Sequence, residues 1–153
     1  MNQNDFYLSD AIDVIEEVLS NGGEFRIYPR GVSMLPLIVQ GRDSVVLKRN
    51  NEIPARKNDI AFYRRKNGQF VLHRVMKIER DGTYTMCGDH QISLERGIES
   101  SQIIAYVSEL YRKDRKVKLH SLRYSAYLLF WNRLLFRRLI LGLVRRLPKK
   151  KKK

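Results

Sequence analysis

Two glycine-containing turns near the middle of the chain restrict its fold more than any other feature of the sequence. Lys66-Asn67-Gly68 and Arg80-Asp81-Gly82 each separate two short runs rich in β-branched and aromatic residues. Asn-Gly and Asp-Gly pairs readily adopt the positive φ angles of tight hairpin turns, and apolar runs of this length beside them are typical of paired strands. The sequence therefore predicts antiparallel hairpins and, with them, a mainly β domain.

Similar runs extend this β region from Glu24 to about Tyr111. We expect strands over residues 25–28, 44–48, 59–64, 70–79, 83–87 and 103–110, because turn residues separate these runs. A chain of 153 residues has room for one such core and little more. The predicted fold class is thus mainly β, of α+β type, with one domain over residues 24–111.

A short amphipathic helix is predicted before this domain. Ser9 has the character of a helix cap, Ile12, Ile15 and Leu19 fall on one helical face, and Asn21-Gly22-Gly23 is a typical stop. Residues 1–23 are therefore expected to form an N-terminal helix packed on the core. The polar first residues and the interrupted acidic segment that follows do not have the form of a secretory signal.

Residues 112–153 form a strongly basic tail. Up to Leu110 the chain has 14 Lys and Arg against 15 Asp and Glu, whereas from Tyr111 onward it has 16 against 1. The spacing of aromatic and leucine residues predicts a long amphipathic helix from His120 to Leu147, followed by five lysines. Its longest charge-free run, residues 124–132, is too short to span a bilayer.

The makeup of this tail favours an anionic membrane surface over a nucleic acid as its partner. Trp131, tyrosines and leucines beside arginines are typical of a helix that lies in the interface, and the lysine run adds attraction to anionic lipid. We therefore expect peripheral membrane association at the cytoplasmic face, and we expect no specific nucleic acid partner. A solubilising tail, or one folded back on the β core, is the alternative.

One serine has the surroundings of a nucleophile. Gly31-Val32-Ser33-Met34-Leu35-Pro36 places Ser33 between a glycine that allows close backbone approach and a proline that fixes the following turn. A serine hydroxyl needs a base to become nucleophilic at neutral pH. Of His73, His90 and His120, only His73 lies inside an apolar predicted strand. A titratable ring in such a strand needs a hydrogen-bond partner or has a functional role.

Three ordered blocks of the sequence resemble the signal peptidase I family of serine peptidases. They are Gly31-Val32-Ser33-Met34-Leu35-Pro36 with Gly41-Arg42-Asp43-Ser44-Val45, then Asn58-Asp59-Ile60-Ala61-Phe62 leading to Leu72-His73-Arg74-Val75, and last Gly88-Asp89-His90-Gln91 with Leu94-Glu95-Arg96-Gly97. They cover roughly residues 25 to 107. A histidine before the arginine of the second block resembles the endoplasmic-reticulum and spore-former members, which carry no lysine there.

The resemblance implies roles for four residues. Ser33 is expected to be the nucleophile, with its backbone N–H in the oxyanion hole, and His73 the general base. The third group is expected to be Glu95, with Asp89 of the Gly-Asp motif as the alternative acid. Gly31 occupies the position of a serine that helps the oxyanion hole in many relatives. No metal or organic cofactor is expected, since the residues show no ligand spacing and no phosphate-binding loop.

The predicted function is therefore that of a serine endopeptidase that cleaves signal or leader peptides from precursor proteins or peptides. The alternative is a non-catalytic, peptidase-like binding protein whose basic tail binds membrane or nucleic acid. A self-cleaving repressor peptidase shares a related serine block, but it has a lysine base and an N-terminal DNA-binding module, neither of which matches this sequence.

Overall fold

A computed structural model describes residues 3–49, 55–119, 121–131, 133, 136–137 and 139–142, with residues 3–10 described by their backbone only. The elements in chain order are α1 (Gln3–Ser20), β1 (Glu24–Ile27), β2 (Asp43–Lys48), β3 (Ile60–Arg64), β4 (Phe70–Ile78), β5 (Tyr84–Cys87), β6 (Glu95–Ile98), a 3-10 helix (Ser100–Gln102), β7 (Ile103–Arg112), β8 (Arg115–Val117) and α2 (Leu122–Trp131). The predicted mainly β class is confirmed.

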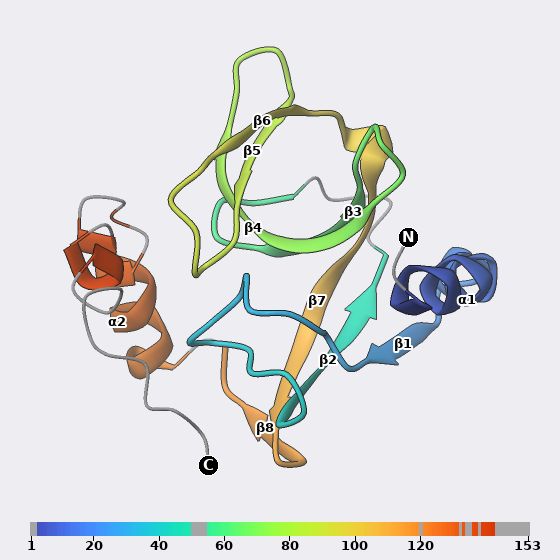
Figure 1. Cartoon of the computed structure of the whole chain (residues 1–153), viewed down its shortest axis with the longest axis horizontal. Helices are drawn as coiled ribbons and strands as arrows, with labels where there is room; N and C mark the ends of the chain where they lie inside the picture. Colours follow the sequence, from blue (N-terminus) through green and yellow to red (C-terminus); the bar gives the residue numbers. More distant parts are fainter. Residues whose placement is uncertain are drawn as a thin grey trace.

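Within the described residues, eight antiparallel strands form one sheet in the order β1-β2-β7-β3-β4-β5-β6, with β8 paired to β7. β7 is the longest strand, and it pairs with β2 on one edge and with β3 and β8 on the other. Figure 1 shows β3 to β6 curling over at one end of the molecule, with α1 and α2 on opposite sides. The connection between β1 and β2 runs through the middle of this arrangement (Figure 1).

Both hairpins form at the expected turns. Gly68 and Gly82 have φ angles of 86° and 82°, the left-handed region that favours glycine. The first turn sets the register of β3 against β4, in which Ala61 lies opposite His73. The six predicted strands agree with β1 to β5 and β7 to within one or two residues at each end.

Two apolar clusters fill the core. The first joins α1 to the sheet and to the β1–β2 connection, and it includes Ile12, Ile15, Leu19, Met34, Leu37, Ile38, Val45, Leu47 and Leu110. The second lies within the curled strands β3 to β6 and consists of Ala55, Ala61, Tyr63, Val75, Tyr84, Met86 and Ile98. The clusters therefore fix the β1–β2 connection on one side and the strand that carries His73 on the other.

The N-terminal helix is longer than predicted. It begins at Gln3 and not at Ser9, so Ser9 lies inside the helix. A serine in a helix interior costs only a fraction of a kcal/mol, so a cap-type residue does not by itself fix where a helix starts. The predicted stop is correct, because the Gly23 amide donates to the Val18 carbonyl and Gly22 has a φ angle of 76°.

The C-terminal helix differs most from its prediction. The prediction of one continuous helix from His120 to Leu147 is wrong, because α2 ends at Trp131 and Arg133 is not helical. Of the described residues that follow, 136–137 and 139–142 are helical. The Trp131 carbonyl accepts a hydrogen bond of 3.0 Å from Nε of Arg137, so a side chain satisfies this helix end. His120 and residues 143–153, with the lysine run, lie outside the described residues.

Two strands were not predicted. β6 contains Glu95, and its sequence Glu-Arg-Gly-Ile lacks the β-branched and aromatic density of the other strands. β8 pairs with the end of β7 through a turn at Lys113 and Asp114, whose φ angles of 47° and 62° are rarely adopted by non-glycine residues. The sheet consequently continues past Tyr111 to Val117.

Candidate functional site

Ser33 lies in the connection between β1 and β2, here called the serine loop (residues 28–42). Gly31, two residues earlier, has a φ angle of 92° and donates its N–H to Oε1 of Gln40 at 2.7 Å. Met34, Leu37 and Ile38, which follow Ser33, are buried in the first core cluster. The loop is therefore fixed by a backbone turn before Ser33 and by apolar packing after it.

Asp43 holds the far end of the serine loop. Its carboxylate is buried and accepts hydrogen bonds from the Val39 N–H at 2.9 Å and from Nε and Nη2 of Arg42 at 2.8 and 2.7 Å. Burial by itself would raise the pKa of Asp43, but the hydrogen bonds from Arg42 and Val39 outweigh it and lower the pKa below the ordinary value. Asp43 is thus an ionised anchor of the loop.

His73 is buried in β4 and contacts a carboxylate. Its Nδ1 lies 3.2 Å from Oε1 of Glu95 in β6 and 3.2 Å from the hydroxyl of Tyr63 in β3. Burial lowers the pKa of His73 below its ordinary value, and the charge of Glu95 opposes this only in part. The surroundings therefore favour the neutral form of the ring.

Two further residues orient Glu95. The Tyr63 hydroxyl donates to Oε2 of Glu95 at 2.9 Å, and Arg65 donates to the same carboxylate from Nε at 2.8 Å and from Nη2. Burial favours a raised pKa for Glu95, but the hydrogen bonds from Arg65 and Tyr63 and the charge of Arg65 lower it below the ordinary value. Glu95 is consequently ionised and directed at Nδ1.

This arrangement selects one tautomer of His73. Since Tyr63 has a single hydroxyl proton and donates it to Glu95, neither neighbour offers a proton to Nδ1. Nδ1 is therefore the protonated nitrogen and donates toward Glu95, which leaves Nε2 as the basic nitrogen. A histidine oriented in this way is equipped to accept a proton from a hydroxyl group.

Ser33 and His73 line the same cleft, which has a volume of about 640 Å³. No hydrogen bond joins the Ser33 hydroxyl to the His73 ring, and within the described residues the Ser33 amide donates to no acceptor. Hydrogen bonds of this kind are often long without substrate and shorten when it binds. The backbone carbonyl of Ser33, by contrast, accepts a 2.7 Å hydrogen bond from the His90 amide.

Asp89 lies apart from His73 and pairs with Arg74. Nε and Nη2 of Arg74 donate to the two carboxylate oxygens of Asp89 at 2.8 and 2.6 Å, and both side chains are fully buried. Because successive residues of a strand point to opposite faces, His73 and Arg74 carry Glu95 and Asp89 on opposite faces of β4. Of the two acids proposed from the sequence, the structure brings only Glu95 to the histidine.

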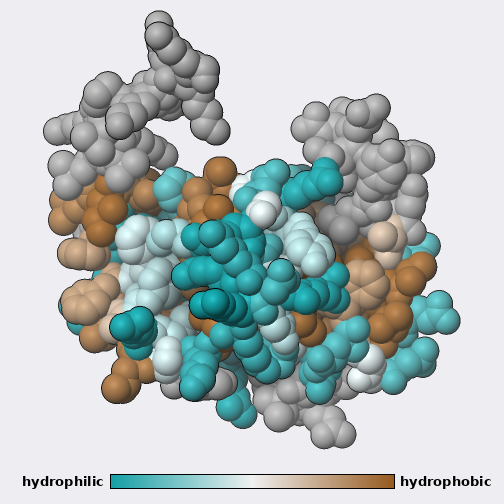
Figure 2. Space-filling model, turned by 90° about the horizontal axis from the view of Figure 1, so that it is seen from below, coloured by the Kyte–Doolittle hydropathy of each residue, from teal (hydrophilic) through white to brown (hydrophobic). Residues whose placement is uncertain are grey.

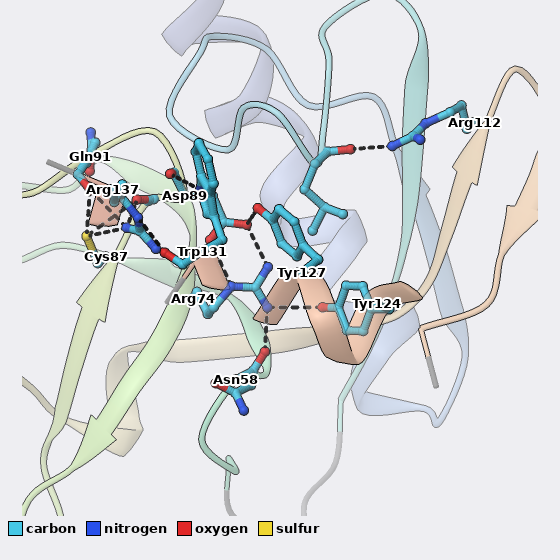
Figure 3. Close-up of polar contacts among 12 residues, drawn as sticks. Asn58, Arg74, Cys87, Asp89, Gln91, Arg112, Tyr124, Tyr127, Trp131 and Arg137 are labelled. Carbon is cyan, nitrogen blue, oxygen red and sulfur yellow. Dashed lines mark hydrogen bonds and ion pairs between the residues drawn. The ribbon is translucent and has the colours of Figure 1, made fainter. Parts of the chain in front are cut away.

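Residues of the C-terminal segment surround Asp89, as Figure 3 shows. Tyr127 donates its hydroxyl to Oδ2 of Asp89 at 2.7 Å, Trp131 donates Nε1 to the Asp89 carbonyl at 2.6 Å, and Tyr124 accepts from Nη1 of Arg74 at 3.0 Å (Figure 3). The aromatic stripe of α2 therefore packs on the β domain. No helix in the described part of the chain is long and apolar enough to cross a bilayer.

The sequence reasoning missed Tyr63 and Arg65 as partners of Glu95, although a signal for Tyr63 was present. The Lys66-Asn67-Gly68 turn fixes the hairpin register, and two-residue periodicity then puts Tyr63 on the same face of the hairpin as Ala61 and its partner His73. Nothing comparable identifies Arg74, Trp131 or Arg137 as partners of residues 88 and 89, which lie 15 or more residues away from them in the chain.

Comparison with protein-family models, with curated proteins and with solved structures found no match to this chain.

Proposed function

We propose that this chain is a serine endopeptidase of the signal-peptidase type, which cleaves signal or leader peptides from precursor proteins or peptides. The observation that carries the proposal is the pairing of His73 with the half-buried Glu95, since His73 lines the same cleft as Ser33. A neutral histidine with its Nδ1 on an ionised carboxylate is the arrangement that activates serine in unrelated peptidases.

The reaction follows from the roles of these groups. Ser33 Oγ attacks the scissile carbonyl carbon while His73 Nε2 takes the hydroxyl proton, and the resulting imidazolium is stabilised by Glu95. The Ser33 amide, which is not engaged by the described residues, stabilises the oxyanion. The histidine then protonates the leaving amine, and water, activated by the same ring, hydrolyses the acyl-enzyme and regenerates the serine.

The cleft suits an extended peptide. Apolar residues line much of its wall, among them Met34, Ile38, Phe62, Phe70 and Leu72, and Ile27 at the end of β1 lines it as well. β1 is the last strand on its side of the described sheet, so its outer edge offers backbone groups that an added strand can pair with. A precursor segment paired there would pass along the cleft, next to Ser33.

We also propose that the protein associates peripherally with anionic membranes, at the cytoplasmic face, through exposed apolar side chains of the C-terminal segment. Apolar side chains there are exposed, namely Leu122, Leu129, Phe130, Phe136 and Leu139, and arginines lie between them. Figure 2 shows apolar side chains gathered at the end of the molecule where α2 lies. Exposed leucine and phenylalanine beside cationic groups favour an anionic interface.

The test is covalent labelling of the full chain with a serine-acylating probe, measured by intact mass and then mapped to the modified residue. We expect wild-type protein to be labelled at Ser33 and expect Ser33→Ala and His73→Ala to abolish labelling at unchanged circular dichroism. Ser101→Ala and His90→Ala are the matched controls, because both lack the carboxylate-paired surroundings, and they should retain labelling. A pool of synthetic precursor peptides, analysed by mass spectrometry, then identifies the bonds that are cleaved.

Labelling that survives Ser33→Ala, or a wild-type chain that remains unlabelled in detergent and in lipid alike, would overturn the peptidase proposal. The alternative of a non-catalytic binding protein then makes its own prediction. Retention on heparin or RNA would fall with salt and disappear with the basic tail, whereas Ser33→Ala would leave it unchanged.

A further inference from the structure

We propose that the C-terminal segment, meaning α2 and the described residues up to 142, is part of the catalytic apparatus, with Tyr127, Trp131 and Arg137 as positioning residues for Ser33. They act through the loop of residues 88–91, here called the clamp loop, which contacts the serine loop directly. The proposal rests on the proposed peptidase function and identifies which part of the chain keeps its nucleophile in place.

The clamp loop touches the backbone of the nucleophile at two points. The His90 amide donates to the Ser33 carbonyl at 2.7 Å, and Gly88 packs so closely that a Cβ atom on it would lie 2.6 Å from the same oxygen. Any displacement of the clamp loop therefore moves or releases the carbonyl of Ser33 itself. The loop is closed by a hydrogen bond of 3.0 Å from the Gln91 amide to the Gly88 carbonyl.

The C-terminal segment holds the clamp loop at both ends and in the middle. Nη1 of Arg137 donates to the carbonyls of Gly88 and Gln91, both at 2.9 Å, and so bridges the two ends of the loop. The Tyr127 hydroxyl donates to the carboxylate of Asp89, and Nε1 of Trp131 donates to the backbone carbonyl of Asp89. Figure 3 shows Tyr127 and Trp131 at Asp89, and Arg137 beside Cys87 and Gln91.

The burial of these contacts makes them strong. Arg137 and Asp89 are fully buried, where hydrogen bonds and charges are screened least and where an unpaired group is costly. Asp89 is also tied to Arg74, the neighbour of His73 in β4, so the same network is anchored to the strand that carries the base. The segment thus sets the position of the nucleophile loop relative to the histidine.

The test measures acylation of Ser33 in three full-length variants, Tyr127→Phe, Trp131→Phe and Arg137→Met. Ser125→Ala and Ala126→Ser are matched controls, because both change exposed residues of α2 that make no side-chain hydrogen bond to the clamp loop among the described residues. We expect the maximal acylation rate to fall roughly ten- to hundredfold in the three variants, since a displacement of about 1 Å has that effect on a reacting pair. The probe concentration for half-maximal rate should change less than about twofold, and the controls should match wild type.

A second readout does not depend on catalysis. The amide of His90 should exchange with solvent at least about fivefold faster in Tyr127→Phe and Arg137→Met than in wild type or in the two controls, because its hydrogen bond to Ser33 is loosened. Trp131 is the single tryptophan of the chain, so its fluorescence reports directly whether the segment remains seated in Tyr127→Phe and Arg137→Met.

Two outcomes separate this inference from the proposed function. If wild-type protein is labelled at Ser33 and the three variants acylate and exchange like the controls, the positioning role is wrong while the peptidase proposal stands. If wild type is not labelled at all, the peptidase proposal fails, and accelerated exchange at His90 alone would show that the segment orders the clamp loop without a catalytic consequence. Tyr127→Phe removes one hydroxyl group only, so it keeps the test decisive should Arg137→Met fail to fold.

Discussion

The neighbours of His73 act on its pKa in opposite directions, so substitutions of Glu95 and of Arg65 should shift that pKa in opposite directions. Burial lowers the pKa, Glu95 raises it, and Arg65 lowers it. Because the neutral ring is the base, the acid limb of the acylation profile follows the pKa of His73. In wild-type protein this limb should lie below pH 6.5, the ordinary pKa of the group.

Glu95→Gln should move the acid limb to still lower pH. The substitution removes the charge that raises the pKa of His73, and it no longer selects the tautomer with a free Nε2. We expect the acylation rate to fall by about 10²- to 10⁴-fold, as expected for loss of the orienting carboxylate. Labelling rates measured between pH 4.5 and 8 test this, with Glu99→Gln, an exposed acid near the end of β6, as the control; an upward shift would contradict the assigned pairing.

Arg65→Gln should move the acid limb in the opposite direction. The Arg65 guanidinium lowers the pKa of His73, so its removal raises that pKa and His73 becomes protonated at a higher pH. The rate above this limb should fall by about tenfold, because Glu95 loses two of its orienting hydrogen bonds. The neighbouring Arg64→Gln, which changes an exposed side chain, should leave the profile unchanged.

At the level of elements, three strands, β3, β4 and β6, and two loops meet at the site. β4 presents His73 on one face and Arg74 on the other, so the catalytic pair and the buried Arg74–Asp89 pair share one rigid strand. The serine loop and the clamp loop meet at the carbonyl of Ser33. A Cβ atom on Gly88 would lie 2.6 Å from this oxygen, which makes Gly88 a sensitive position for testing how the loops fit.

Gly88→Ala should lower the free energy of unfolding by about 1–3 kcal/mol and slow acylation of Ser33, because the added methyl group meets a backbone oxygen that cannot move without the serine loop. Urea unfolding and labelling rates measure the two effects. Gly142→Ala is the control, since no atom lies within 4 Å of a Cβ there and alanine favours helix over glycine. Equal stability and rate in Gly88→Ala and wild type would show that the loops are not in contact as described.

At the scale of the whole molecule, the C-terminal segment carries two sets of side chains. One set is hydrogen-bonded to the clamp loop and Arg74, and the other consists of exposed leucine and phenylalanine side chains. No side chain belongs to both sets. Binding to a membrane and positioning of the nucleophile are therefore separable by mutation.

The double substitution Leu129→Ser with Phe130→Ser should reduce binding to vesicles that contain phosphatidylglycerol by at least tenfold, since each buried side chain of this size contributes about 1.5–3 kcal/mol. Sedimentation with vesicles measures binding, and the wild-type interaction should weaken with added salt and be absent with phosphatidylcholine alone. Val14→Ser, an exposed apolar residue of α1, should bind like wild type. Loss of binding in that control would show that the lipid-binding surface is not confined to the C-terminal segment.

The local sequence determined the hairpins, the stop of α1 and the mainly β class, because glycine turns and short apolar runs act over a few residues. It also placed His73 in a strand and Ser33 in a loop. The local sequence did not determine which acid contacts His73. Glu95 and Asp89 are six residues apart, and only the pairing of β5 with β6 puts one beside His73 and leaves the other to Arg74.

The tertiary structure likewise decided which surface the aromatic stripe of α2 packs against. An aromatic stripe at helical spacing has the same pattern whether it meets lipid or protein, so periodicity alone does not identify its partner. The choice depends on hydrogen-bond acceptors from distant parts of the chain, namely the Asp89 carboxylate and the carbonyls of residues 88, 89 and 91. Buried polar groups need partners, and the side chains of Tyr127, Trp131 and Arg137 supply them.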